Sequence, residues 1–393
     1  MKRSSRNWRG SQSIAMGMVG ALLLAACAGG EGTDEPFAAE EDDGAPSSDE
    51  EIDLTYASAI VSGATSDQLE NWLFEEVEAR TDGRVTVEQF NDNSLVTAFE
   101  TLPAIQDGRA DAGFWMHPYN PYEAPLFEVA GLPFQTDSEY AIAWTLWEMY
   151  QEDELFREDL HAIDMRPIFF GFSPSAVTMT TEPTETLADL AGLRLRVVGD
   201  VAEAFRDIGV EPVAADPLEV YESIQRGVLD GSGVWVMEAA AANAIYEVAP
   251  HITHSGVGVY TGWGFWMNNS TWESLPPEVQ ETFDEVTEEL IYETGPELYV
   301  EGAAESCEQF LDAGGTVTLI AEDEVEAWSD RVLDGLVDRW VDEVVTRKGM
   351  SEDEVRAWRD AFLERLEANT ELAESKGLVP DLVACHEQYL ARQ

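Results

Sequence analysis

Short apolar segments with strand character alternate with helical segments along most of the chain, and this alternation constrains the fold more than any other feature. The main predicted strands are 52–57, 84–90, 112–116, 165–172, 193–198, 228–236 and 263–267. Apolar residues at helical spacing fill the intervals, most clearly over 65–77, 138–151 and 276–312. Strands that alternate with helices are typical of sheets covered by helices. The order of elements therefore predicts an α/β fold.

The first 26 residues have the composition of an export signal. Basic residues at positions 2, 3, 6 and 9 precede a short apolar stretch, 15–26, which is too short to span a membrane as a mature helix. The sequence Leu24-Ala25-Ala26-Cys27 resembles a bacterial lipobox, which implies cleavage before Cys27 and lipidation of its thiol. An ordinary signal peptide with a chance cysteine is the alternative. Acyl chains would tether the protein to the membrane from outside, and 27–51 is predicted to be a disordered acidic linker.

The charge balance is extremely acidic, with 78 Asp and Glu residues against 22 Lys and Arg and a formal net charge of −56. Such a field repels the phosphate backbone, so nucleic-acid binding is excluded. The 45% of apolar residues exclude a wholly disordered acidic chain. No apolar run reaches the roughly 18–20 residues of a spanning helix. Because surface carboxylates are screened at high ionic strength, the composition predicts a halophilic acidic surface.

The sequence contains no recognisable catalytic, cofactor or metal motif. Neither HExxH nor GxSxG nor a Walker-type loop occurs. His251 and His254 have a spacing that could suit a metal, but no third ligand accompanies them. We therefore expect no enzyme activity, no cofactor and no metal, and an acidic secreted hydrolase is the weakest of the readings considered.

Two cysteines remain once Cys27 is assigned to lipid. Cys307 and Cys385 form an even pair in a compartment that is expected to be oxidising, so a disulfide between them is possible. Two separate buried thiols are the alternative.

Seven short motifs occur in one order between residues 54 and 277. The most specific is Leu187-Ala188-Asp189-Leu190-Ala191-Gly192-Leu193-Arg194-Leu195-Arg196-Val197, and the others lie at 54–58, 72–83, 107–114, 128–134, 219–231 and 268–277. Together they resemble the DctP-type solute-binding proteins of TRAP (tripartite ATP-independent periplasmic) transporters. The resemblance extends over about 52–290, whereas the last hundred residues match only in being helical.

This resemblance implies a two-lobed periplasmic-binding-protein-like fold with a long helix linking the lobes. Lobe I is expected to comprise 52–173 and 263–305, and lobe II 174–262 and 306–393. The implied function is that of an extracytoplasmic receptor, periplasmic or at the cell surface, which binds a small organic acid and delivers it to the TRAP permease membrane subunits. A lipid-anchored ligand-binding subunit of an ABC-type importer or of a sensor is the alternative.

The resemblance also implies a site residue, because Arg196 stands where the family has an arginine that pairs with the ligand carboxylate. A guanidinium is always charged, and its fork of donors matches a carboxylate. The sequence departs from the family pattern at two places. Ala176 occupies the place of a second arginine found in some members, and the stretch after Gly231 lacks their Glu-Asn-Pro sequence.

Aromatic residues are plentiful where these polar groups are missing. Trp115 and Trp235 are the leading candidates for a ligand cradle, because they lie at or just beyond the C-terminal ends of predicted strands. Further candidates are Phe172 and Trp263, the polar His117, and the rings of Phe114, Tyr119 and Phe265. Core packing is the alternative for each ring. Rings in place of polar groups predict a monocarboxylate with an apolar or aromatic body.

Overall fold

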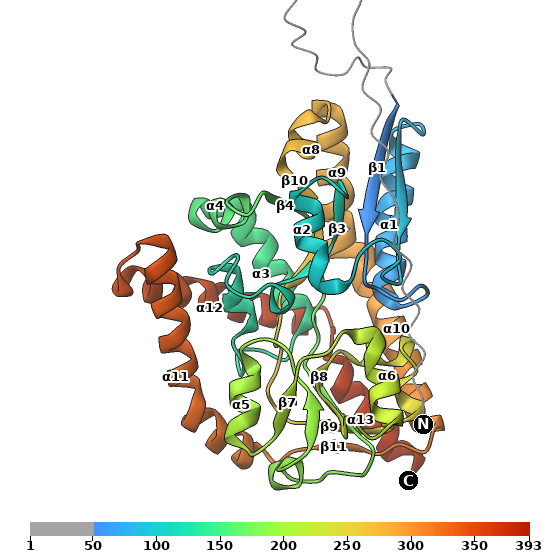
Figure 1. The fold of residues 1–393 in the computed structure, drawn as a ribbon, viewed down its shortest axis with the longest axis vertical. Coiled ribbons are helices and arrows are strands. Elements are labelled where there is room, and N and C mark those ends of the chain that lie inside the picture. Colours follow the sequence, from blue (N-terminus) through green and yellow to red (C-terminus); the bar gives the residue numbers. More distant parts are fainter. Residues whose placement is uncertain (1–50) are drawn as a thin grey trace, which may run out of the picture. The chain divides into compact units, whose positions relative to one another are not determined.

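The computed structural model describes residues 51–393, and these form two β-sheets covered by helices. The predicted export signal, Cys27 and the linker up to residue 50 lie outside the described residues. Figure 1 shows the strands of the first sheet in the upper half of the view and those of the second in the lower half.

The first sheet, sheet A, has five strands in the order β2-β1-β3-β10-β4. Their bounds are β1 (Ile52–Ala57), β2 (Val85–Phe90), β3 (Ala112–Met116), β4 (Met165–Phe170) and β10 (Trp263–Asn268). Strand β1 pairs in parallel with β2 and β3, whereas β10 runs antiparallel between β3 and β4. A strand from late in the chain therefore completes the sheet that the first strands begin.

The second sheet, sheet B, has six strands in the order β11-β9-β5-β8-β6-β7. Their bounds are β5 (Val177–Thr180), β6 (Arg194–Arg196), β7 (Glu211–Val213), β8 (Gly231–Trp235), β9 (His251–His254) and β11 (Val317–Leu319). Strand β5 is antiparallel to both β8 and β9, and the remaining pairs are parallel.

Helices occupy most of the intervals between strands. They are α1 (Thr65–Arg80), α2 (Thr101–Gln106), α3 (Glu139–Glu152), α4 (Glu154–His161), α5 (Val201–Asp207), α6 (Pro217–Gln225), α7 (Met237–Ala242), α8 (Asn269–Ser274), α9 (Pro277–Glu289), α10 (Gly295–Asp312), α11 (Glu322–Lys348), α12 (Glu352–Ser375) and α13 (Asp381–Arg392). Side-chain caps determine where some of these helices begin. Ser138 caps α3 by accepting a hydrogen bond from the Ala141 N–H, and Asp153 caps α4 in the same way.

A nearly continuous helix joins the elements of the two sheets. Helices α9 and α10 follow one another through a π-helical turn at Leu290–Thr294. Helix α1, beside sheet A, packs against both of them, and α10 also packs against α7 and α13. The π turn leaves the Ile291 carbonyl to accept a hydrogen bond from the Trp144 indole at 3.0 Å. The predicted α/β fold with a linking helix is confirmed.

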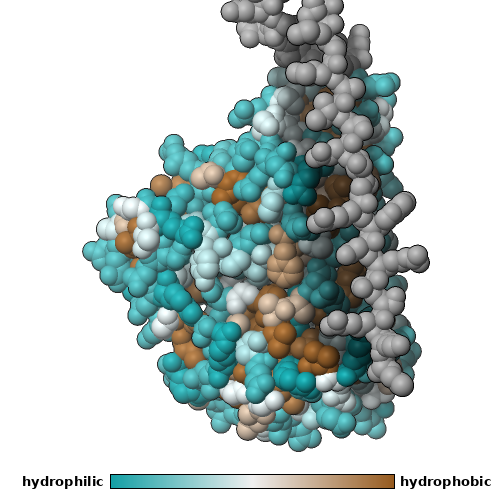
Figure 2. Space-filling view, in the orientation of Figure 1, coloured by the Kyte–Doolittle hydropathy of each residue, from teal (hydrophilic) through white to brown (hydrophobic). Residues whose placement is uncertain are grey.

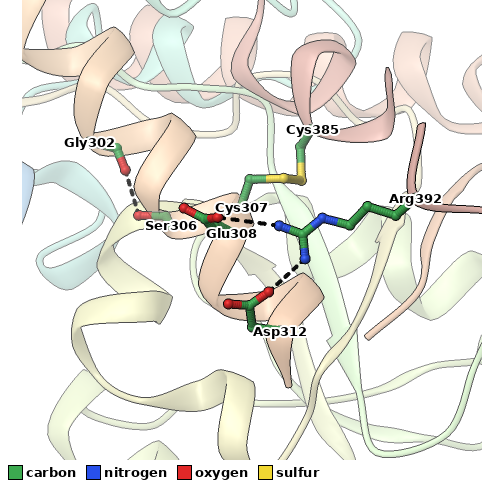
Figure 3. The surroundings of a disulfide bond; sticks show 7 residues. All are labelled: Gly302, Ser306, Cys307, Glu308, Asp312, Cys385 and Arg392. Carbon is green, nitrogen blue, oxygen red and sulfur yellow. Dashed lines mark hydrogen bonds and ion pairs between the residues drawn. A yellow bond between two sulfur atoms is a disulfide. The ribbon is translucent and has the colours of Figure 1, made fainter. Parts of the chain in front are cut away.

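The C-terminal helices fasten to different parts of the molecule. Helix α12 packs along α3, where Asn369 Nδ2 donates to Thr145 Oγ1 at 3.1 Å. Helix α13 is tied to α10 by a disulfide between Cys307 and Cys385, and Arg392 forms an ion pair with Asp312 at 2.6 Å beside it (Figure 3). Since α12 packs against a helix assigned to lobe I, the assignment of all of 306–393 to lobe II stays a prediction.

The face of the molecule in Figure 2 is mostly hydrophilic, with hydrophobic patches among the polar residues. Exposed carboxylates begin both long C-terminal helices, for example Glu322 and Asp323 on α11 and Glu352 and Asp353 on α12. Negative charge in the first turn complements the helix dipole as well as adding to the acidic surface.

Candidate functional site

A cavity of about 70 Å³, partly open to solvent, brings residues of both sheets together. Sheet A contributes Phe114 and Met116 from β3 and Trp263 from the start of β10. Sheet B contributes Arg196 from the end of β6 and Trp235 from the end of β8, and Glu238 of α7 adds an acidic side chain.

Arg196 is the buried cation of this cavity, with 1% of its surface exposed. Its Nε donates to the Ala215 carbonyl at 3.4 Å and its Nη1 to the Val234 carbonyl at 3.2 Å. The guanidinium carbon lies 4.9 Å from the centre of the Trp235 ring. No ion pair joins Arg196 to a carboxylate within residues 51–393. A buried cation without a counter-charge is unfavourable, so this geometry is suited to an anionic ligand.

Two phenol groups interact with the same guanidinium. Burial raises the pKa of Tyr119, and the Arg196 charge opposes that rise only in part. Burial likewise raises the pKa of Tyr260 against the opposing effect of Arg196. Both hydroxyls are therefore neutral donors at physiological pH, available to a ligand oxygen held at Arg196.

Arg194 differs sharply from Arg196 although only one residue separates them. Its guanidinium pairs with Asp230, with Nη2 2.7 Å from Oδ1 and Nε 3.0 Å from Oδ2. Asp230 also accepts the backbone N–H of Arg194. Arg194 at the start of β6 therefore has a carboxylate partner, whereas Arg196 at the end of the strand pairs with no carboxylate of residues 51–393.

Of the sequence-predicted site residues, the structure places Arg196, Trp235 and Trp263 at the cavity. The Trp263 ring packs against Phe114 with 5.5 Å between centres, and its indole nitrogen donates to the Phe172 carbonyl at 3.2 Å. The rings thus form an apolar wall close to the cationic group.

The structure does not place Trp115, His117 or Phe172 at the cavity. Trp115 is fully buried on the other face of β3, against Trp266, because successive strand residues point to opposite faces. Burial of His117 lowers its pKa to about 3, so this imidazole is neutral. Phe172 is fully buried within the core.

Some residues that line the cavity were not predicted from the sequence, and others were named only as secondary candidates. Phe114 and Tyr119 were noted only as rings, whereas Tyr260 and Glu238 were not singled out. For Phe114, the signal available in the sequence was its alternation with Met116 along β3. Tyr260 lies two residues after Gly258, whose positive φ of 75° and close approach to the Thr136 carbonyl exclude a side chain at that glycine.

A serine, a histidine and an aspartate also meet away from the cavity lining. Ser175 Oγ lies 2.7 Å from Asp137 Oδ1 and 2.8 Å from His254 Nε2, and the same Nε2 lies 3.3 Å from that carboxylate oxygen. A hydrolytic triad uses the two different ring nitrogens for serine and acid, so this cluster lacks the required geometry. It joins the segment before α3 to the end of β9.

Neither a metal centre nor a membrane span occurs in the part of the chain that the structure describes. Over residues 51–393, no group of three or more His, Cys, Asp or Glu side chains is placed to hold a metal ion. Helices long and apolar enough to cross a membrane are likewise absent from this range.

The family model described as bacterial extracellular solute-binding protein, family 7 (DctP), matches residues 64–340. The chain belongs to this family. DctP proteins are solute-binding proteins of TRAP transporters and not enzymes, which agrees with the prediction from the sequence motifs. The recognition of the family and the expectation of no enzyme activity are therefore confirmed.

Curated relatives of this DctP protein carry different ligand names. The monocarboxylate 2-oxoacid-binding periplasmic protein of Nostoc sp. is 24% identical over 222 residues, covering 53% of this chain and 58% of the relative. The C4-dicarboxylate-binding periplasmic protein DctP of Rhodobacter capsulatus is 26% identical over 268 residues, covering 65% and 77%. The matched stretch is thus less than two thirds of the length of the Nostoc protein.

Solved structures show the same fold. A marine metagenome TRAP solute-binding protein, specific for aromatic acid ligands and in complex with 3-hydroxybenzoate, superposes with a TM-score of 0.71 at 22% identity. The superposition covers 81% of this chain and 99% of that one. At this identity the likeness establishes the two-lobed fold and not the ligand.

Proposed function

We propose that this DctP protein is a receptor for a small monocarboxylic acid with an apolar or aromatic body. The observation that carries the proposal is the buried Arg196 guanidinium, which has no carboxylate partner in residues 51–393 and faces a cavity walled by rings. A ligand carboxylate would supply the missing counter-charge through a bidentate pair. The rings of Trp235, Trp263 and Phe114 would bury the rest of the ligand.

The charges around the cavity favour one carboxylate over two. Arg196 is the sole cationic side chain among the described residues that line it, and Glu238 is the acidic one. A second carboxylate would be buried without a cation, so its desolvation would not be compensated. The names of relatives include both classes, a monocarboxylate in the Nostoc protein and a C4-dicarboxylate in the Rhodobacter protein. The cavity lining supports a monocarboxylate.

Delivery and location complete the proposal. The receptor would act outside the cytoplasm and pass its ligand to the TRAP permease membrane subunits, and its family favours this role over a subunit of an ABC-type importer or a sensor. We further propose that Cys27, outside the described residues, carries the lipid anchor. The wild-type protein should then incorporate a labelled fatty acid and Cys27→Ser should not, and a wild-type protein without label would contradict anchoring.

A competition series tests the ligand class. Mono- and dicarboxylic acids of matched size would be titrated in high salt, with intrinsic tryptophan fluorescence as the signal, because Trp235 and Trp263 line the cavity. We expect arylalkyl or branched monoacids to bind more tightly than succinate or malate. Tighter binding of succinate or malate than of every monoacid would overturn the proposal.

A further inference from the structure

Glu238 is the unexplained polar side chain of the cavity. It lies in the first turn of α7, lines the cavity together with Arg196, and has only 3% of its surface exposed. Its Oε2 atom is fully buried and makes no hydrogen bond of normal geometry among residues 51–393, although the Tyr299 phenol interacts with the same carboxyl. Because an unsatisfied buried oxygen is costly, its presence beside a ligand site points to a partner on the ligand.

Behind Glu238 lies a buried group of acids, here called the carboxyl cluster, which consists of Glu238, Glu139 and Asp381. Glu139 begins α3 and Asp381 begins α13, and both oxygens of each are buried without a hydrogen-bond partner among the described residues. Tyr299 of α10, fully buried, interacts with all three. On the cavity side, Tyr260 is the phenol that faces Glu238.

The carboxyl cluster keeps Glu238 protonated at neutral pH. Burial raises its pKa to about 8, and the nearby Asp381 charge adds to the rise. Burial and the neighbouring acids likewise raise the pKa of Glu139. For Asp381, burial raises the pKa to about 7, with Asp137 adding to the rise and His254 opposing it. A protonated carboxyl offers one donor and one acceptor instead of a negative charge.

We propose that Glu238 is a second polar contact of the ligand and selects acids that carry a hydroxyl group in addition to their carboxylate. This inference rests on the proposed function, because it assumes that Arg196 holds the carboxylate in the same cavity.

The chemistry of Glu238 matches a hydroxyl better than other groups. A hydroxyl is neutral and, like the protonated carboxyl, both donates and accepts, so the pair can satisfy both partners without burying charge. An acid without the hydroxyl leaves a buried Glu238 oxygen unpaired, and sites built for a hydrogen bond discriminate against such analogues. A cationic nitrogen would instead require the ionised carboxylate, which the cluster disfavours.

The test compares ligands that differ by one hydroxyl, measured by calorimetry in high salt at pH 6.5. The pairs are mandelate against phenylacetate and 3-hydroxybenzoate against benzoate. In the wild-type protein we expect at least one hydroxy acid to bind about tenfold more tightly than its partner, the scale of one net hydrogen bond. Glu238→Leu should abolish this preference and still bind the hydroxyl-free acid.

Two further variants separate a ligand contact from a structural role. Glu238→Gln keeps a donor and an acceptor, so the hydroxyl preference should persist. Glu139→Gln removes a carboxyl of the same cluster that does not line the cavity, so its preference should equal that of the wild type. Loss of preference in Glu139→Gln equal to that in Glu238→Leu would overturn a direct contact.

The pH dependence supplies an independent reading. Above pH 8 the ionised Glu238 cannot donate and repels the ligand carboxylate, so wild-type affinity for mandelate should fall between pH 7 and 9. The affinity of Glu238→Gln should change less over that range. Mandelate affinity that rises with pH, or a hydroxyl preference that persists in Glu238→Leu, would overturn the inference. Equal binding of hydroxylated and plain acids would overturn it while leaving the proposed function intact, whereas failure of every monoacid to bind would overturn both.

Discussion

Replacement of Arg196 by methionine should have opposite effects on ligand binding and on the stability of the empty protein. Methionine keeps much of the length of the side chain but removes the charge, so Arg196→Met deletes the carboxylate partner with little loss of volume. Arg196 is 1% exposed, donates long hydrogen bonds of 3.4 Å and 3.2 Å to two backbone carbonyls, and interacts with the phenols of Tyr119 and Tyr260. In the empty protein it is a buried charge that no carboxylate of residues 51–393 pairs with.

The size of the binding effect follows from the burial of that charge. Truncation of one partner of a buried, hydrogen-bonded charge pair costs about 2–5 kcal/mol. At about 1.4 kcal/mol per tenfold, the dissociation constant of a monoacid should rise roughly 30-fold to several thousand-fold. Replacement of a buried charge by an apolar group of similar volume is often neutral or stabilising. The melting temperature of the ligand-free variant should therefore stay equal to that of the wild type or exceed it.

Arg194→Met is the matched control on the same strand. Arg194 is paired with Asp230 and does not line the cavity, so this variant should keep wild-type affinity and lose some stability. Calorimetry with one monoacid and thermal unfolding without ligand, both in high salt, give the two readings. Near-wild-type affinity of Arg196→Met, or a clear fall of its ligand-free melting temperature, would refute the reasoning, because Arg196 would then be a structural residue.

Three other predictions concern stability. The double variant Cys307→Ser, Cys385→Ser removes the disulfide, whose two cysteines have a sequence separation of 78. Its free energy of unfolding should fall by up to about 4 kcal/mol, seen as a lower melting temperature that reductant no longer changes. An unchanged melting temperature would contradict this. Burial raises the pKa of Glu70 and of Glu128 to about 8 from 4.5, so the folded state holds these protons more tightly than the unfolded state. The stability that the protonated Glu70 and Glu128 contribute is complete below pH 4.5 and is lost as pH rises through 8. The melting temperature should therefore fall from pH 6 to pH 9. A flat or rising curve would contradict the raised pKa of these two residues. Finally, the melting temperature should rise steeply as NaCl increases from dilute to molar, and a flat curve would refute the halophilic interpretation of the acidic surface.

The sequence predicted the fold well where apolar patterning is strong. The strands of sheet A and the long helix from 277 to 312 were all anticipated, because each is a sustained apolar or periodic segment. Strands β5 and β9 were missed. Each is four residues long and consists largely of threonine or histidine, as in His251–His254, so only pairing with its neighbours defines it as a strand.

The site was predicted less completely, because the sequence does not show which face of a strand is turned to the cavity or which of many acidic residues is buried. Phe114 and Trp115 are adjacent aromatic residues at the same strand end, and only the orientation of β3 in the sheet decides that Phe114 faces the cavity. Glu238 is one of 78 acidic residues, and nothing local in the sequence marks it. Its distinction is burial, which arises where α7 packs against α10, a helix far along the chain.

The position of β10 also determines the order in which the molecule can be completed. This strand fills the gap between β3 and β4, so sheet A stays open until residues 263–268 have been synthesised, after nearly all of sheet B. Contacts between segments so far apart in sequence form slowly. A nascent chain that has not reached β10 exposes the unpaired edges of two apolar strands, which favours transport across the membrane before folding. It follows that sheet A cannot be expressed intact as a contiguous fragment without most strands of sheet B, and that a circular permutant beginning after β10 would have to recover that strand from its C-terminal end.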